Sequence, residues 1–295
     1  MSLSQRQYPE IIADLAALET FLRGLGLHKG PDRLRQLAKN VAIIDAALKA
    51  GTLDSLEKRK DVEDLVWSLV DAQEFIKIYE GLKDEPLDVM KPLWRKALQG
   101  TLHPGRETAY KSNIGRNTAF ELRLASGLRK AGAQVHLGQQ ADLILDHAGV
   151  RVYVECKRPY IPSTIRANIE EARKQLQRRL NVDTHPLCIG LVAISVSRAI
   201  NPGSRLFVAD APNALQNLAN DLLQIHKDNS ADLYDLPDLR LAGILYHIYT
   251  PAYVKSVTLL TAAGQTVLFM SHSAMQSNFP VSGGEALKSF LQVAL

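Results

Sequence analysis

A short apolar stretch, VYVECKRPY at residues 152–160, carries a carboxylate and a lysine two positions apart. Side chains alternate between the two faces of a β-strand, so Glu155 and Lys157 would share one face if this stretch is a strand. Such a pair is either a solvated ion pair or part of a catalytic site. The opposite face would carry small apolar side chains suited to a protein core, those of Val152, Val154 and Cys156.

A second carboxylate, Asp142, opens the preceding apolar run at residues 141–146. The sequence Asp-His-Ala-Gly at 146–149 predicts a hairpin turn between the two runs, and Asp146 is expected in that turn because aspartate favours such positions. Counted from the turn, antiparallel pairing brings Asp142 to about the level of Glu155. Two carboxylates and one lysine would then lie together.

A third carboxylate is predicted on the helix that precedes these strands. This helix runs through residues 119–132, with Asn117 or Thr118 as its cap and Gly132 at its end. Glu121 has leucine or alanine three, four and seven positions later, so it borders the apolar stripe that should pack on the sheet. A carboxylate there is unfavourable unless it is paired or binds a cation.

Three carboxylates and a lysine suit the metal-dependent hydrolysis of a phosphodiester. Carboxylate oxygens on neighbouring strands can hold Mg²⁺, which keeps several of its own waters and binds phosphate oxygens. A bound metal lowers the pKa of its water and stabilises the charge that develops at phosphorus. The backbone carbonyl of Cys156 can add a further oxygen ligand, and the ammonium of Lys157 can orient the water or neutralise the transition state.

In their order along the chain, these residues resemble the PD-(D/E)XK, or restriction-endonuclease-like, nuclease superfamily. The resemblance covers about residues 117–195 and rests on Glu121, Asp142 and the Glu155-Cys156-Lys157 motif. One departure is that Asp142 follows alanine, where the family pattern has proline. The predicted order of helix, three strands and helix around the motif strengthens the resemblance.

The resemblance implies an α/β fold with a restriction-endonuclease-like core, in which a mixed central sheet is flanked by helices. It implies a Mg²⁺-dependent endonuclease, with Mn²⁺ able to substitute, that hydrolyses DNA phosphodiester bonds in restriction, repair or phage defence. Lys157 would be catalytic, and Gln175 is the best match to a family residue that the following helix directs at the site. The implied metal ligands are Asp142, Glu155, Glu121 and the Cys156 carbonyl. The alternative is a non-catalytic nucleic-acid-binding or assembly protein that retains the nuclease fold.

Positive charge is concentrated beside the motif. The chain has a net charge of +4, but residues 151–180 alone contain eight Lys and Arg against three Glu. A phosphate backbone requires such a concentration, although a solvated helix face, with basic residues at the helix C-terminus, has the same pattern. The candidate nucleic-acid-binding residues are Arg158, Arg166, Arg173 and Lys174, with Arg116 from the preceding basic segment.

The chain divides into three parts by its residue patterns. Residues 1–100 have helical spacing throughout and predict an all-helical N-terminal domain for targeting or dimerisation. Residues 101–116 contain Pro104, Gly105 and Gly115 and predict a linker. Residues 117–295 predict the nuclease-like domain, with a second helix after Pro162, a buried strand near 187–196, a helix at 211–227 and late strands.

Composition excludes several other classes. A chain of 295 residues with 46% hydrophobic and 22% charged residues is typical of a globular protein, and its longest apolar run is too short to span a bilayer. No secretory signal is visible and the two cysteines form no disulfide framework, which favours a cytoplasmic protein. No membrane partner is expected, and a homodimer is possible. Phosphate-binding, dinucleotide-binding and nucleophile-elbow motifs do not occur.

Overall fold

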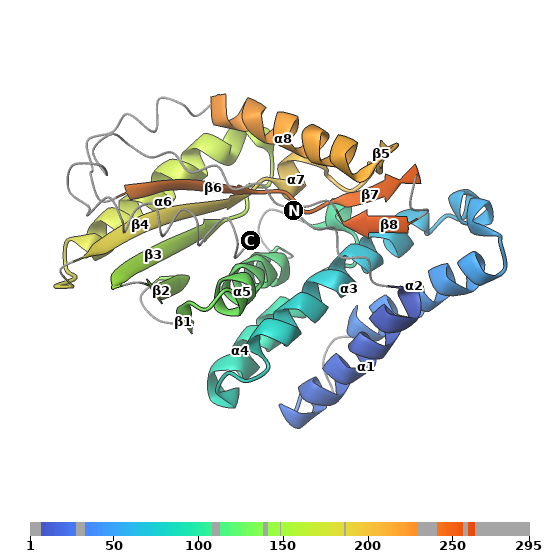
Figure 1. Cartoon of the computed structure of the whole chain (residues 1–295), viewed down its shortest axis with the longest axis horizontal. Helices are drawn as coiled ribbons and strands as arrows, with labels where there is room; N and C mark the ends of the chain where they lie inside the picture. The colour runs from blue at the N-terminus through green and yellow to red at the C-terminus, as the bar shows by residue number, and fades with distance from the viewer. Residues whose placement is uncertain are drawn as a thin grey trace. The chain divides into compact units, whose positions relative to one another are not determined.

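A computed structural model shows the chain as two compact units, each made from segments that are distant in sequence (Figure 1). The residues that the structure describes are 7–27, 33–107, 113–137, 141–147, 149–185, 187–228, 241–255 and 259–262. The first unit takes its residues from 1–123, 201–216 and 249–264, and the second from 124–200, 217–248 and 265–295. The first unit therefore continues through the segment predicted as a linker and adds two later segments.

Helices form most of the first unit. Every element described before residue 107 is helical, as predicted for residues 1–100, and the first three α-helices pack on one another. The elements are α1 (Tyr8–Gly24), α2 (Arg33–Lys49), the 3₁₀ helix η1 (Leu53–Lys58), α3 (Val62–Leu82), α4 (Leu87–Ala97) and the 3₁₀ helix η2 (Pro104–Arg106).

Local sequence explains where α1 begins and which face it buries. The backbone N–H of Gln7 donates to Glu10 Oε2 at 2.9 Å, which is half of a capping box at the helix start. Leucine and isoleucine recur at helical spacing along one side and are at most 4% exposed, namely Ile11, Leu15, Leu18 and Leu22. The cap therefore sets where α1 begins, and burial of its apolar stripe stabilises the helix.

A three-stranded sheet completes the first unit. Its strand order is β5-β7-β8, with β5 (Phe207–Ala209) parallel to β7 (Pro251–Val254) and β8 (Leu259–Ala262) antiparallel to β7. Helix α3 packs against β7 and β8. The unit that contains the N-terminal helices is therefore not all-helical, because later parts of the chain supply strands to it.

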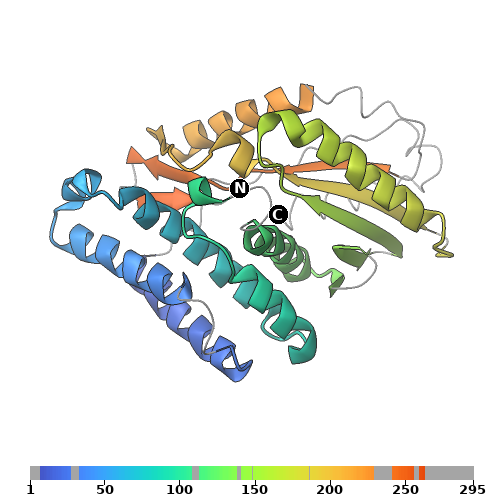
Figure 2. The same ribbon diagram turned by 180° about the vertical axis from the view of Figure 1, so that it is seen from behind.

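The second unit contains a mixed five-stranded sheet, so the fold is α/β as predicted. The strand order is β1-β2-β3-β4-β6, in which the first two pairings are antiparallel and the last two are parallel. Helix α6 (Ile165–Leu180) packs on β3 and β4 and covers one face (Figure 2). The strands are β1 (Gln134–Leu137), β2 (Leu143–His147), β3 (Val150–Lys157), β4 (Cys188–Ser195) and β6 (Leu241–His247).

Two of the remaining helices take residues from both units, and two short elements lie within the second unit. Helices α5 (Ile114–Lys130) and α8 (Pro212–Asp228) each contribute residues to both units, and the short elements η3 (Pro162–Thr164) and α7 (Ser197–Ile200) flank α6 and β4. The predicted order of helix, three strands, helix and strand is confirmed by α5, β1 to β3, α6 and β4. The predicted strand and helix signals beyond residue 262 lie outside the described residues.

The start of α5 differs from the prediction. The helix begins at Ile114 rather than after Asn117 or Thr118, so the end of the predicted linker is helical. Gly115 is required by a close approach, because a Cβ there would lie 1.9 Å from the carbonyl oxygen of Gln99. Arg116 therefore sits in the first turn of a helix, where a tertiary contact holds it.

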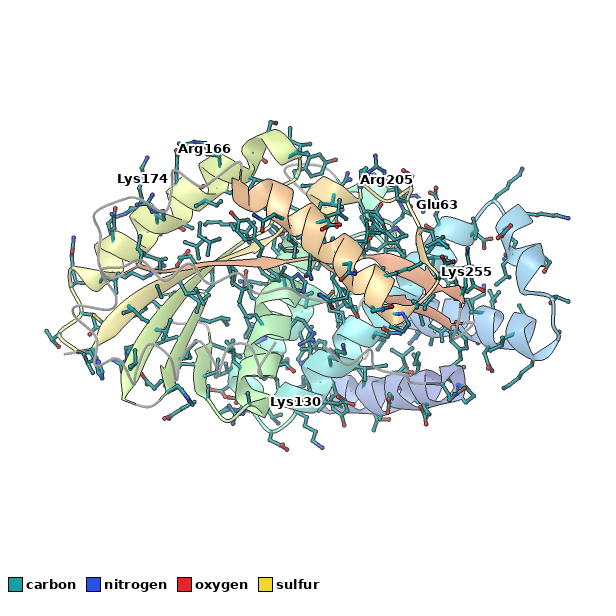
Figure 3. The ribbon with its side chains drawn as sticks, turned by 45° about the horizontal axis from the view of Figure 1, so that its top comes forward. Glu63, Lys130, Arg166, Lys174, Arg205 and Lys255 are labelled. Atoms are coloured by element: carbon teal, nitrogen blue, oxygen red, sulfur yellow. The ribbon has the colours of Figure 1, made fainter. Side chains whose placement is uncertain are left out.

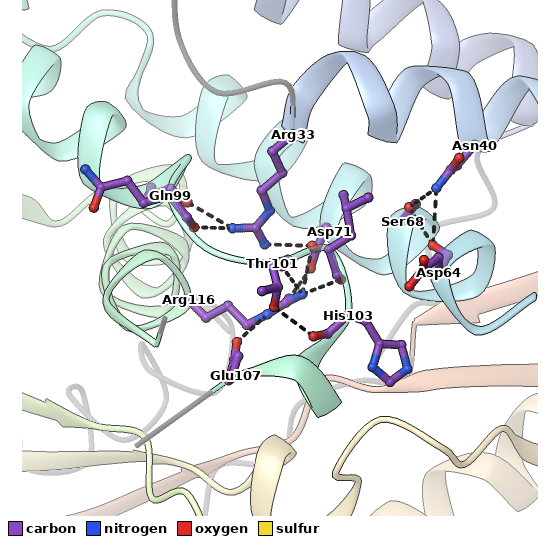
Figure 4. Close-up of polar contacts among 12 residues, drawn as sticks. Arg33, Asn40, Asp64, Ser68, Asp71, Gln99, Thr101, His103, Glu107 and Arg116 are labelled. Atoms are coloured by element: carbon purple, nitrogen blue, oxygen red, sulfur yellow. Dashed lines mark hydrogen bonds and ion pairs between the residues drawn. The ribbon is translucent and has the colours of Figure 1, made fainter. Parts of the chain in front are cut away.

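That contact is a buried ion network in the first unit (Figure 4). The carboxylate of Asp71, on α3, is 1% exposed and forms ion pairs with Arg33 at 2.7 Å and with Arg116. Arg116 also pairs with Glu107, at 2.7 Å between Nε and Oε1. Burial raises the pKa of Asp71, but the charges of Arg116 and Arg33 outweigh that effect and lower it below its usual value.

The two arginines also bind backbone carbonyls. Arg33 Nη1 donates to the carbonyl oxygen of Gln99 at 2.7 Å, and Arg116 Nη2 donates to that of Leu102 at 2.7 Å. The network therefore joins α2, α3, the segment that follows α4 and the start of α5. Its members are far apart in sequence, so it fixes the tertiary arrangement of the first unit.

Glu74 provides a pH prediction for the same region. Burial and the charge of Asp71 raise the pKa of Glu74 to about 7, against the opposing effect of Arg116, Arg123 and Arg33. A raised carboxyl pKa stabilises the fold at low pH, and this contribution is lost as pH rises from 4.5 through 7. The difference in unfolding free energy between Glu74→Gln and wild type should therefore shift in favour of the variant by up to about 3 kcal/mol between pH 4 and pH 8.

Denaturant unfolding at a series of pH values measures this difference. Glu57→Gln, at an exposed position of the same unit, is the matched control. A Glu74→Gln effect that stays constant across the pH range would show that Glu74 ionises alike in the folded and unfolded chain.

Candidate active site

The hairpin of β2 and β3 brings two of the predicted acids together. The pairing of Leu143 with Val154, extended by one residue, places Asp142 opposite Glu155. Asp142 Oδ2 also accepts a hydrogen bond from the backbone N–H of Cys156 at 2.7 Å. The level predicted for Asp142 from the turn count is therefore what the structure has.

The turn itself is tighter than the predicted segment 146–149. Strand β2 extends to His147 and β3 begins at Val150, with Gly149 in the left-handed region at φ 78°. Asp146 lies in β2 rather than in the turn, and pairs with Arg151 at 3.0 Å. It is thus a structural residue of the hairpin, at the opposite end from the acids of the site.

Glu155 is a buried carboxylate between two cations. Its side chain is 3% exposed, Oε1 forms an ion pair with Arg179, and Oε2 lies 3.9 Å from Lys157 Nζ. Burial and the negative charge of Asp142 raise the pKa of Glu155 to about 7, against the opposing effect of the two cations. A strongly perturbed acid beside a second acid is typical of functional sites.

Lys157 is the last residue of β3, and its side chain is 17% exposed. Its ammonium donates a hydrogen bond to Gln175 Oε1 at 2.7 Å and lies 3.8 Å from Glu171 Oε1. Gln175 Nε2 in turn donates to Glu171 Oε1 at 3.4 Å. The helix α6 therefore fixes the ammonium beside Glu155, and Gln175 points to the lysine as the resemblance implies.

Strand β3 and helix α6 meet through a regular series of polar contacts. Two residues of a strand span about 6.6 Å and four residues of a helix span about 6 Å, so every second residue of β3 can face every fourth residue of α6. The strand and the helix run in opposite directions. Successive residues along β3 therefore contact residues of progressively lower number in and just after α6. The contacts, which we call the β3–α6 series, are Tyr153 with Asp183, just after the helix, Glu155 with Arg179, and Lys157 with Gln175.

Comparison with protein-family models, with curated proteins and with solved structures finds no match to this chain. Its chemistry therefore has to be inferred from the geometry of its own residues. Within the described part of the chain, no helix is both long and apolar enough to cross a membrane.

Two of the predicted basic residues are buried and three are accessible. Arg116 is 7% exposed within the ion network of the first unit, and Arg173 is 8% exposed on α6. Burial removes both from a nucleic-acid-binding surface, which corrects the prediction for them. Arg166 and Lys174 project from the outer side of α6 (Figure 3), and Arg158 is half-buried just after β3.

Glu121 is the predicted metal ligand that belongs to the first unit. It lies on α5 at a half-buried position, whereas Asp142, Glu155 and Lys157 all belong to the second unit. Its role as a metal ligand stays a prediction. The apolar face predicted for β3 is confirmed, since Val152 and Val154 are fully buried and Cys156 is 9% exposed.

Arg179 is the residue of the site that the sequence prediction missed. From the sequence it is one of the eight basic residues of 151–180, suited either to a phosphate backbone or to the C-terminal end of the helix dipole. A signal for it does exist, because Glu171, Gln175 and Arg179 recur every fourth residue beside the apolar stripe of α6. The buried apolar positions of that stripe are Ile165, Ile169, Ala172, Leu176 and Leu180.

The oxygen donors at this end of β3 suit a hard cation such as Mg²⁺. Asp142 and Glu155 supply two carboxylates from adjacent strands. The N–H and C=O of a strand residue point to the same side, so the Cys156 carbonyl is expected on the side of β3 where its N–H contacts Asp142. Within the described residues no group of three His, Cys, Asp or Glu side chains is arranged to hold a metal, so waters or substrate oxygens would complete the shell.

Proposed function

We propose that this protein is a Mg²⁺-dependent nuclease that hydrolyses phosphodiester bonds in DNA. The observation that carries the proposal is the convergence of Asp142, Glu155 and Lys157 at one end of a hairpin, with Gln175 holding the lysine. A surface ion pair does not require a buried acid, a second acid at its level and a helix that fixes the lysine. The order of elements around the motif supports the resemblance to PD-(D/E)XK nucleases.

Each residue has a distinct role in this proposal. Asp142, Glu155 and the Cys156 carbonyl bind the cation, which when present supplies Lewis acidity toward the phosphate and lowers the pKa of a water. Lys157 places a compact positive charge beside the acids, where it orients the attacking water or stabilises charge on the phosphoryl group. Gln175 positions that ammonium through its hydrogen bond of 2.7 Å.

The basic side chains of the second unit supply affinity for the phosphate backbone. Arg166 and Lys174 are exposed on the outer side of α6, and Arg158 follows directly on β3. Contacts of this kind position a nucleic acid without reading its bases. The proposal therefore predicts binding that weakens steeply with salt concentration.

A divalent-dependent cleavage assay tests the proposal. Supercoiled plasmid, linear duplex, single-stranded DNA and RNA are incubated with the purified chain in Mg²⁺, in Mn²⁺ and in a chelator. Cleavage of DNA in either metal and none in the chelator is the expected result. Absence of cleavage in both metals across all substrates, or cleavage that persists in the chelator, would refute the proposal.

A non-catalytic protein with the same fold is the second candidate, and one observation favours it. Glu155 already has Arg179 as an ion-pair partner, so the acid does not depend on a metal for its charge balance. This candidate predicts DNA binding without turnover in any metal. The same assay, combined with a gel-shift measurement, separates the two.

A further inference from the structure

We infer that Arg179 is an internal counter-ion that divalent metal must displace from Glu155, and that the displaced guanidinium then binds the phosphate of the substrate. The inference rests on the proposed function and adds to it a coupling between metal binding and nucleic-acid binding. It starts from a side chain that the family resemblance did not point to.

A metal ion bound to Glu155 would place a further cation beside Arg179 on one buried carboxylate. The Glu155 side chain is only 3% exposed, so little solvent is present to screen the charges that lie beside it. One oxygen contacts the guanidinium and the other lies 3.9 Å from Lys157. A Mg²⁺ ion takes oxygen ligands at about 2.0–2.1 Å in strict octahedral geometry. A metal ion and the guanidinium of Arg179, both in contact with the carboxylate of Glu155, would repel each other strongly in a poorly solvated site.

Of the two cations, Arg179 is the one that can leave. Its side chain is 26% exposed and lies in the last turn of α6, so its end has access to solvent. Lys157 is held in addition by Gln175 at 2.7 Å and is near Glu171. Metal binding therefore exchanges the guanidinium and leaves the ammonium in place.

A phosphodiester is the partner that suits the released side chain. The planar guanidinium forms paired hydrogen bonds with phosphate oxygens as it does with a carboxylate. A phosphate that binds the same cation as Glu155 arrives within reach of the arginine that this cation has displaced. Metal and nucleic acid should then each increase the affinity of the other, because such coupling is reciprocal.

Matched variants on α6 test the first step. Arg179→Gln removes the counter-ion and Arg179→Lys keeps its charge. Arg178→Gln makes the same charge change at the adjacent exposed residue, whose Nε donates to the Lys174 carbonyl at 3.1 Å. Titration calorimetry with Mg²⁺ alone, without nucleic acid, should show binding about tenfold tighter for Arg179→Gln than for wild type. Arg178→Gln should match wild type, and Arg179→Lys should lie between.

The second step is tested by DNA binding. Fluorescence anisotropy of a short labelled duplex, in chelator and in Ca²⁺, measures how far the cation strengthens DNA binding. Wild type and Arg178→Gln should gain at least about fivefold in affinity with Ca²⁺, and Arg179→Gln should lose most of this gain. Circular dichroism and thermal unfolding establish that each variant is folded. Arg179→Lys, which keeps the charge but not the planar guanidinium, should retain part of the Ca²⁺ effect.

The outcomes separate the inference from the proposed function. If Asp142→Asn abolishes Mg²⁺ binding but Arg179→Gln binds Mg²⁺ as wild type does, the inference is wrong and the metal site stands. An unchanged Ca²⁺ effect on DNA binding in Arg179→Gln would also refute it. If wild type binds no Mg²⁺, or binds it equally well after Asp142→Asn, both the inference and the proposed metal site fail.

Discussion

Replacing Lys157 with alanine should lower kcat for DNA cleavage by about 10²- to 10³-fold and leave duplex affinity almost unchanged. The ammonium is fixed beside the buried Glu155 by its bond to Gln175, so it acts on charge at the reacting centre. A preorganised charge of this kind contributes more in the transition state than in the ground state. The fold should survive, because Glu155 retains Arg179 as its partner.

The matched control for this variant is Lys174→Ala, which removes the same charge from an exposed position on α6. It should weaken DNA binding and reduce its salt dependence, with kcat largely preserved. Single-turnover rates with saturating enzyme and anisotropy measurements of affinity distinguish the two effects. Equal cleavage rates for Lys157→Ala and wild type would show that the lysine has no part in the chemistry.

Replacing Asp71 with alanine should destabilise the first unit by about 3–5 kcal/mol. The change leaves Arg33 and Arg116 buried without the carboxylate that lies between them. Arg116 keeps Glu107, but Arg33 has lost the partner that offset its desolvation, and burial already lowers the pKa of Arg33. Removing one member of a buried ion pair leaves an uncompensated charge, which is far more costly than losing an exposed pair.

Urea unfolding followed by circular dichroism measures this loss. Asp61→Ala is a suitable control, because Asp61 forms an exposed ion pair with Arg59 at 2.8 Å just before the same helix. It should change the unfolding free energy only slightly. If the two substitutions cost the same, the buried network does not stabilise the unit in the way that its geometry indicates.

The geometry of the hairpin could be predicted because it depends on local rules. Strand alternation placed Glu155 and Lys157 on one face, and the turn count placed Asp142 beside them. These predictions need only the spacing of residues within about twenty positions. Gln175 came instead from the resemblance to PD-(D/E)XK nucleases, and the structure places it within hydrogen-bonding distance of Lys157.

The predictions that failed depended on distant parts of the chain. Arg116 reads as an exposed residue of a basic loop, but Asp71, forty-five positions earlier, holds it inside the first unit. The sheet of the first unit pairs β5 with β7 across more than forty residues, and no local pattern marks such a pairing. Arg179 required knowledge of how α6 lies on β3.

The β3–α6 series has a consequence for how the gene can change. Strand and helix advance together only while both remain uninterrupted, so inserting or deleting one codon within residues 165–174 would turn the rest of the helix by about 100°. Arg179 would then lose its contact with Glu155 in the same event that moved Gln175 away from the lysine. Length variation should therefore be confined to the connection at 158–164, whereas α6 can vary in side chains but not in length.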